Sequence, residues 1–237
     1  MKALLLSLLL LAGLCRAETL TIATGEWPPY SSATLPHYGT VMAQVAQAFA
    51  AAGIEVHYEF MSWNRALELT RAGKYVATPM WLKTPDRMRD FLLVGPIVTS
   101  TVVLFHRKDR PFEWQSMNDL AAIRIGVALG YSYGPAFDKL MAGHVLTPDV
   151  APNDELGLIR VAGGHIDAFL LDRDVGLYLI EHAGRDAVKN ELTFHPRPVH
   201  SDPTYLLFSR KYPNSDALAQ RFAAAWAKLQ ATGAIRN

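Results

Sequence analysis

Three short segments carry side chains that could hold a small charged molecule. The first is Thr84-Pro85-Asp86-Arg87, where an arginine lies in the first turn of a predicted helix. A guanidinium fixed in this way can donate two parallel hydrogen bonds to one carboxylate. The second segment contains Ser132, just before a predicted helix whose free N–H groups favour an anion. The third ends at Asp172, which follows a predicted strand. One cationic and one anionic group suit a zwitterionic ligand.

Aromatic side chains lie near these segments. The turn Gly25-Glu26-Trp27-Pro28-Pro29-Tyr30 follows the first predicted strand, and Trp81 ends the third. Open α/β sheets bind ligands at the carboxyl ends of their strands, so Glu26, Trp27, Tyr30 and Trp81 fall where a ligand is expected. The alternative is that these aromatic rings only cover the edge of the core.

The elements that must position these residues alternate between strand and helix. The first set of predicted strands is 19–24, 54–60 and 75–81, with helices over 40–52 and 62–72. The second set of predicted strands is 123–129, 145–150 and 166–171, with helices over 135–142, 153–162 and 174–182. Such alternation predicts parallel sheets with right-handed crossovers.

The connections between the two sets predict two Rossmann-like α/β lobes joined by two hinge connectors. An apolar run ends at Gly95-Pro96, a β-branched strand follows over 99–105, and a charged segment at 106–110 reads as the first connector. The second connector is expected near 199–204, after which a strand and an amphipathic helix return to the first lobe. The predicted domains are a signal peptide at 1–17, lobe 1 at 18–106 plus 204–237, and lobe 2 at 107–203.

The amino terminus has the pattern of a cleaved secretory signal. Met1-Lys2 is basic, Ala3 to Leu14 is mostly apolar, and Cys15-Arg16-Ala17 offers small residues for cleavage before Glu18. The apolar stretch is shorter than the ~20 residues of a membrane span. A periplasmic location is therefore expected. Cleavage would remove the one cysteine, and with it Lys2 and Arg16, so the formal charge would change from 23 − 22 = +1 to 21 − 22 = −1. Nothing in this charge pattern favours nucleic acid as a partner.

The chain resembles the type II periplasmic solute-binding proteins of the polar amino-acid family, which are the capture components of ABC importers. The resemblance rests on the order and spacing of four motifs. They are Gly25-Glu26-Trp27-Pro28-Pro29-Tyr30, Thr84-Pro85-Asp86-Arg87 followed by Phe91 and Gly95-Pro96, Ile125-Gly126-Val127 leading to Gly130-Tyr131-Ser132, and Gly163-Gly164-His165-Ile166-Asp167-Ala168 leading to Asp172.

The resemblance implies roles for individual residues. Trp27 would stack on the ligand, Arg87 would bind its α-carboxylate together with Ser132 and nearby amides, and Asp172 would take its ammonium group. Glu26, Tyr30, Trp81 and Tyr131 complete the expected ligand-binding set. The expected partners are an amino acid or small carboxylate and an ABC permease in the inner membrane. No cofactor is expected, and the protein is expected to be a monomer.

One segment and one further residue depart from the pattern of that family. Pro79-Met80-Trp81-Leu82 precedes the Thr84 turn where amino-acid binders usually carry hydroxyl residues, and Val76 replaces a common aspartate. These changes favour a wider or more apolar pocket.

Two enzymatic alternatives remain open. Gly130-Tyr131-Ser132-Tyr133-Gly134 is a literal G-x-S-x-G, and Asp172 with His195 or His200 satisfies the chain order of a serine hydrolase. The motif begins the second lobe and no Gly-rich oxyanion loop precedes it, which disfavours this interpretation. The same fold also includes a cyclohexadienyl or arogenate dehydratase, for which Glu26 would be the acid or base. The eight histidines show no i, i+4 pair, so the sequence predicts no metal site.

Overall fold

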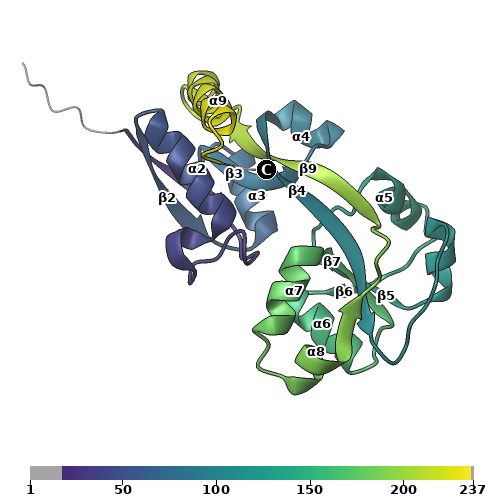
Figure 1. Cartoon of the computed structure of the whole chain (residues 1–237). Coiled ribbons are helices and arrows are strands. Elements are labelled where there is room, and N and C mark those ends of the chain that lie inside the picture. Colours follow the sequence, from purple (N-terminus) through teal and green to yellow (C-terminus); the bar gives the residue numbers. More distant parts are fainter. Residues whose placement is uncertain (1–17, 236–237) are drawn as a thin grey trace, which may run out of the picture.

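The computed structural model describes residues 18–235, which form two α/β lobes (Figure 1). The predicted signal peptide, including Cys15, lies outside the described residues. The strands are β1 (Glu18–Thr24), β2 (Ile54–Phe60), β3 (Ala77–Leu82), β4 (Phe91–Arg107), β5 (Ile125–Ala128), β6 (Asp149–Ala151), β7 (Ala168–Asp172), β8 (Leu192–Phe194) and β9 (His200–Ser209). The helices are η2 (Pro36–Tyr38), α2 (Thr40–Ala51), α3 (Trp63–Arg71), α4 (Pro85–Asp90), η3 (Met117–Ala122), α5 (Pro135–Ala142), α6 (Asp154–Ala162), α7 (Arg173–Glu181), α8 (Asp186–Glu191) and α9 (Ser215–Ala231). The predicted α/β class with two lobes is confirmed.

One mixed sheet passes through both lobes in the order β2-β1-β3-β9-β4-β7-β5-β6, with β8 paired to β4. In lobe 1, β1 pairs in parallel with both β2 and β3. In lobe 2, β5 pairs in parallel with both β6 and β7. The carboxyl ends of β1, β3, β5 and β7 therefore carry the turns that face the space between the lobes, as expected for a sheet built from strand–helix–strand units.

The last helix, α9, packs back on lobe 1 as the sequence predicts. Phe222 of α9 is fully buried and its ring centroid lies 4.6 Å from that of Phe49 on α2. Phe208 of β9 completes the aromatic contact from beneath. Because α2 places its apolar residues on one stripe, both helices can cover the same face of the sheet.

Two long strands cross from one lobe to the other (Figure 1). β4 pairs with β9 in lobe 1 and continues, without a break in the strand, to pair with β7 over Val102–His106. The sequence pattern predicts separate runs at 91–94 and 99–105, and the structure corrects this. Gly95-Pro96 lies at a register shift between Val94 and Val98, where a bulge tolerates the missing N–H of proline.

The predicted lobe limits at 106 and 204 remain a proposal. Because Val102–His106 already pair with β7, the pairing favours a first crossing that is earlier, close to the bulge at Gly95-Pro96.

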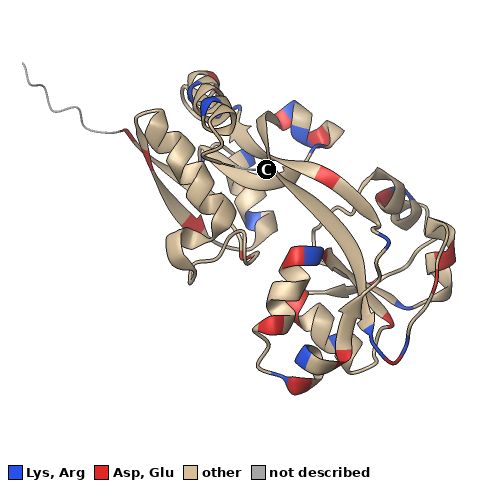
Figure 2. Cartoon of the chain, viewed as in Figure 1, with Lys and Arg blue, Asp and Glu red and all other residues tan. Residues whose placement is uncertain are grey.

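Lysine and arginine residues, and aspartate and glutamate residues, are spread over both lobes (Figure 2). Within residues 18–235, no helix combines the length and the apolar character that a membrane span requires.

Candidate functional site

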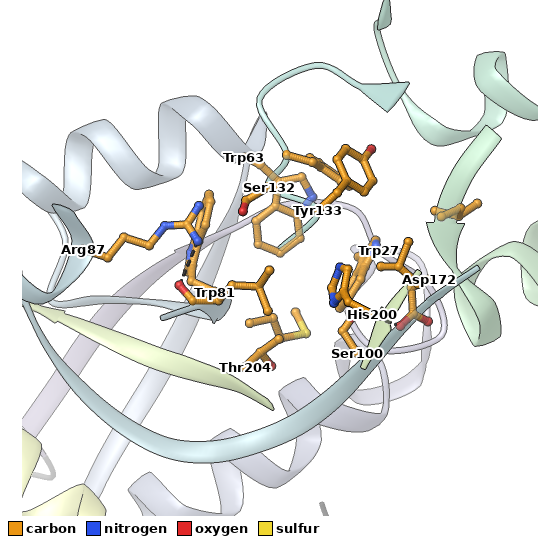
Figure 3. A pocket seen from close by; sticks show the side chains of 15 residues that line it. Trp27, Trp63, Trp81, Arg87, Ser100, Ser132, Tyr133, Asp172, His200 and Thr204 are labelled. Carbon is orange, nitrogen blue, oxygen red and sulfur yellow. Dashed lines mark hydrogen bonds between the residues drawn. The ribbon is translucent and has the colours of Figure 1, made fainter. Parts of the chain in front are cut away.

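A cavity of about 70 Å³ lies between the two lobes, and a single buried water needs roughly 10–15 Å³ on the same measure, so the cavity has room for a small molecule. Figure 3 shows its lining side chains pointing inward from both lobes. The lining residues are Trp27, Trp63, Met80, Trp81, Leu82, Arg87, Ser100, Val102, Tyr131, Ser132, Tyr133, Leu171, Asp172, His200 and Thr204.

Arg87 is a buried cation at one end of this cavity. The Thr84 hydroxyl caps α4 by accepting from the Arg87 amide at 3.3 Å, which fixes the first helical turn. The guanidinium lies over the Trp81 ring, 4.6 Å from its centroid, and donates to the Leu82 carbonyl at 2.8 Å. Within residues 18–235, no carboxylate lies within 4.0 Å of this guanidinium. Burial lowers the pKa of Arg87 to about 10, which leaves it charged at neutral pH.

A bulge in β3 positions the apolar residues that precede Arg87. The pairing with β9 shifts register between Thr78 and Trp81. Met80 has a φ of 62°, a value that residues other than glycine rarely adopt. The Trp81 indole donates to the Thr78 hydroxyl at 3.0 Å, so its ring is held under the guanidinium. Met80 and Leu82 both line the cavity, in agreement with the apolar pocket that the sequence favours.

Ser132 lines the cavity but its hydroxyl is engaged within lobe 2. It donates to the Asp138 carboxylate, and the Tyr133 amide donates to the same carboxylate at 2.9 Å. The groups that sequence reasoning assigns to the ligand carboxylate therefore already hold the chain's own anion. Asp138 also raises the pKa of Arg87 against the larger effect of burial, because the two charges attract.

Asp172 caps α7 and ties it to β4. One carboxylate oxygen accepts from the amides of Asp174 and Val175 at 3.0 and 3.2 Å. The other accepts from the Ser100 hydroxyl at 2.9 Å and the Thr101 amide at 3.0 Å. Burial is the main cause of the raised pKa of Asp172, and these hydrogen bonds oppose it. A carboxylate offers about four acceptor positions, so all of them are occupied.

Aromatic rings form the wall between Arg87 and Asp172. Trp63 contacts Trp27 edge-on at a centroid distance of 6.4 Å and Trp81 at 5.6 Å. Gly25 allows this packing, because a Cβ at its position would lie 2.6 Å from the Trp63 ring. Tyr131 and Tyr133 close the wall from lobe 2. Surfaces lined by aromatic rings favour apolar ligand atoms.

Two residues of the predicted ligand-binding set do not line this cavity. The Tyr30 hydroxyl donates to the Asp174 carboxylate of lobe 2 at 3.1 Å, so Tyr30 links the lobes. The exposed Glu26 side chain accepts from the Ala33 amide at 3.0 Å and borders a neighbouring cavity. Trp27, Trp81, Arg87, Tyr131, Ser132 and Asp172 do line the cavity.

The predicted ligand-binding set omits several residues that line the cavity, among them His200, which the sequence offered only as an alternative partner for a serine hydrolase. Its two ring nitrogens are buried without a hydrogen bond, although Nδ1 lies 3.0 Å from the Asp202 carboxylate. The Asp202 carboxylate attracts the protonated ring and so opposes the effect of burial on the pKa of His200. Burial lowers the pKa of His200, which favours the neutral ring. No motif marks this position, since His200 only begins β9.

Contacts between the lobes enclose the cavity. Gly130 has a φ of 81°, and a Cβ there would lie 2.2 Å from the Asn64 side chain of lobe 1. Glycine is therefore required both by its backbone conformation and by the approach of α3. Together with the bond from Tyr30 to Asp174, this contact joins the two lobes beside the cavity.

A second cavity adjoins the first and contains a buried carboxyl group. It lies between the Glu26 turn and the start of α6, and Trp63 and Tyr131 border both cavities. Asp154 is 7% exposed, accepts from the Tyr131 hydroxyl at 3.3 Å through Oδ2, and has no partner for Oδ1. Burial raises the pKa of Asp154 to about 7.

Comparisons with solved structures identify the fold. The chain is similar to the periplasmic binding protein of an arginine third transport system from Legionella pneumophila, with 16% identity, 92% of this chain and 96% of that chain covered, and a TM-score of 0.75. It is similar to a histidine kinase sensor domain that resembles periplasmic binding proteins, with 19% identity, 92% and 93% coverage, and a TM-score of 0.74. An ancestral amino-acid-binding protein, a precursor of cyclohexadienyl dehydratase, matches with 18% identity, 91% and 90% coverage, and a TM-score of 0.69.

No protein-family model matches the sequence, and comparison with curated proteins finds no match. The likeness is therefore one of fold, with nearly complete coverage of both chains. Two α/β lobes joined by paired crossing strands, with a cavity enclosed between them, agree with it. This chain has the type II periplasmic-binding-protein fold.

Proposed function

We propose that this protein binds a small carboxylate solute between its lobes, outside the cytoplasm, and delivers it to an ABC importer. The observation that carries the proposal is the buried guanidinium of Arg87, which faces the cavity without a carboxylate partner among the described residues. A buried unpaired charge is costly, and unpaired charges in clefts mark functional sites. An anionic ligand would supply the missing partner.

Ligand binding would favour the closed arrangement of the lobes. Arg87, Trp27 and Trp81 belong to lobe 1, whereas Tyr131 and Asp172 belong to lobe 2. A ligand that touches both sets has more contacts in the closed form than in an open one. It therefore shifts the equilibrium toward closure by the difference in its affinity for the two forms.

The transport role is supported by the likeness in fold to a binding protein of a transport system, and the likeness to a sensor domain supports a second role in signalling. The expected permease partner and the periplasmic location belong to the proposal, as does the monomeric state. Loss of solute uptake on deletion of this chain supports the importer. Unchanged uptake with an altered transcriptional response to the solute supports the sensor.

The enzymatic alternatives receive less support from the geometry. Ser132 donates to Asp138 and not to a histidine. His195 packs against Phe112 and Trp114, outside the cavity. His200 does line the cavity, but its Nδ1 lies beside the Asp202 carboxylate and not beside that of Asp172. Glu26 is exposed and does not line the cavity that contains Arg87, which disfavours it as a dehydratase acid. Turnover of prephenate or arogenate that is lost in Glu26→Gln would support the dehydratase instead.

A thermal-shift screen of amino acids and organic acids tests the proposal, because a ligand that binds the native state raises the melting temperature. Arg87→Ala should weaken binding of the hit by roughly 2–5 kcal/mol. Arg87→Lys should restore only part of the affinity, since an ammonium lacks the planar fork. Arg89→Ala is the matched control, because Arg89 is an exposed arginine on the same helix, paired with Asp86. Equal affinity of the Arg87→Ala and Arg89→Ala proteins would refute the assignment.

A further inference from the structure

We propose that the solute is a carboxylate with an apolar body and no ammonium group. This inference rests on the proposed function and names the chemical class of its ligand. The sequence motifs favour a zwitterionic ligand, whose ammonium group would need a free carboxylate. In the structure, the carboxylate expected to bind that ammonium group already has all its acceptor positions occupied.

The carboxylate end of the cavity is available to a ligand. The bond to the Leu82 carbonyl uses one of the five N–H groups of Arg87, and it is the only hydrogen bond of the guanidinium within residues 18–235. Stacking on Trp81 holds the plane of the guanidinium in place. The fork can therefore receive an anion with little loss of side-chain entropy.

The opposite end is not available to an ammonium group. Asp172 is the one acidic residue in the cavity lining, and four protein donors occupy its two oxygens. An ammonium has three N–H groups to satisfy and a charge to neutralise. It could gain Asp172 only by displacing the cap of α7 or the Ser100 and Thr101 donors.

The remaining polar groups of the lining do not replace that acceptor. The hydroxyls of Ser100, Ser132 and Thr204 donate to Asp172, to Asp138 and to the Val98 carbonyl. Their oxygens are neutral acceptors, as is the imidazole of His200. A desolvated ammonium beside neutral acceptors and a buried arginine is unfavourable.

The walls instead match apolar ligand atoms. Nine of the fifteen lining residues are aromatic or aliphatic, namely Trp27, Trp63, Met80, Trp81, Leu82, Val102, Tyr131, Tyr133 and Leu171. The Trp27 indole N–H is buried without a partner, and as a donor it can serve only a ligand acceptor such as a carboxylate or carbonyl oxygen. This unpaired donor could bind an anionic ligand group, but it offers no acceptor to an ammonium group.

Matched pairs of ligands test the inference by isothermal titration calorimetry on the purified chain. 3-Phenylpropionate and L-phenylalanine share a skeleton and differ by the ammonium group, as do 4-methylpentanoate and L-leucine. We expect the acid without the ammonium to bind at least tenfold more tightly in one or both pairs, and this affinity to be lost in Arg87→Ala. 2-Phenylethylamine, which has the ammonium but no carboxylate, should not bind.

The inference is overturned if, in a pair that shows binding, the amino acid binds more tightly than its matched acid. It is also overturned if none of the four carboxylates binds. The proposed function has a separate outcome: another carboxylate that binds in an Arg87-dependent manner would leave it standing.

A substitution at Ser100 tests the reason for the selectivity. Ser100→Ala removes one of the four donors to Asp172 and frees an acceptor position at the cavity. The ratio of acid to amino-acid affinity should then fall severalfold, because the ammonium gains an ionised partner. An unchanged ratio, with the protein folded by circular dichroism, would overturn the role given to the occupied Asp172.

Discussion

Asp154 gives the sharpest prediction about stability. Its carboxyl group is buried, which disfavours the charged form, and its Oδ1 has no hydrogen-bond partner. Its pKa is about 7 in the fold, against 3.8 for an ordinary aspartate. Below about pH 4 the carboxyl is protonated in both the folded and unfolded chain, and its charge costs nothing. Between about pH 4 and 7 the unfolded chain releases the proton while the folded chain retains it. The free energy of unfolding therefore falls as pH rises through this window. Above about pH 7, the contribution of Asp154 no longer changes with pH.

The size of the effect follows from the two pKa values. Their difference corresponds to roughly 4 kcal/mol above pH 7, as an upper limit. Asp154→Asn removes the charge and keeps an oxygen that can accept from Tyr131. The substitution also loses the favourable interaction of a negative charge with the start of α6, which costs roughly 0.3–1 kcal/mol of stability. We expect the variant to match the original chain near pH 4 and to exceed its free energy of unfolding by about 3 kcal/mol at pH 8.

Urea unfolding followed by tryptophan fluorescence, at intervals from pH 4.5 to 8.5, measures this difference. Glu155→Gln is the matched control, because Glu155 is the next residue on α6, is exposed, and loses the same charge. A free-energy difference between Asp154→Asn and the original chain that stays constant with pH would refute the reasoning, whatever its size.

Three further predictions concern closure and packing. Tyr30→Phe removes the hydrogen bond to Asp174 and should weaken ligand binding about fivefold, the equivalent of roughly 1 kcal/mol, as measured by calorimetry. Gly130→Ala places a Cβ against Asn64 at a positive φ, so closure should be impeded, ligand affinity should fall more than tenfold, and small-angle scattering should show a larger radius. Phe222→Ala leaves a cavity between α9 and α2, and should lower the free energy of unfolding by roughly 3–5 kcal/mol in urea.

Matched substitutions separate these effects from general damage. Gly184→Ala should leave affinity unchanged, because a Cβ there meets no atom within 4 Å and the φ is not positive. Gln220→Ala changes an exposed residue of α9 and should alter stability by less than about 0.5 kcal/mol. A Tyr30→Phe protein with the original affinity would show that the bond to Asp174 does not favour closure. A Gly130→Ala protein that closes normally would show that the Asn64 side chain can move aside for the added Cβ.

Much of the fold could be predicted from the sequence because its periodic segments agree with their final packing. The helices at 40–52 and 135–142 and the strand at 54–60 differ from α2, α5 and β2 by at most one residue. The crossing strand was harder to predict. Gly95-Pro96 indicates a break in a local pattern, and only the pairing with β9 and β7 shows that the strand continues.

The site was predictable at Arg87 and less so around it. A Thr-Pro pair before an arginine favours a local helix cap, and Thr84 caps α4 in the structure. The Ser132 hydroxyl donates to Asp138, six residues away, and Asp172 accepts from Ser100, which is 72 residues distant. Motif spacing therefore located these groups near the cavity but could not show whether their hydrogen-bonding positions were free.

The pairing of β4 with β9 restricts how the protein can move. The two crossings are hydrogen-bonded to each other on both sides of the bulge, over 91–94 and 98–102, so neither can bend alone. They behave as one ribbon, and the Trp226 indole of α9 binds the Pro96 carbonyl at 3.1 Å beside its weakest point. The proposed opening of the lobes would then follow nearly a single coordinate. In that case a bound solute would change one angle between the lobes, and a partner could detect this angle at the outer surface without touching the solute.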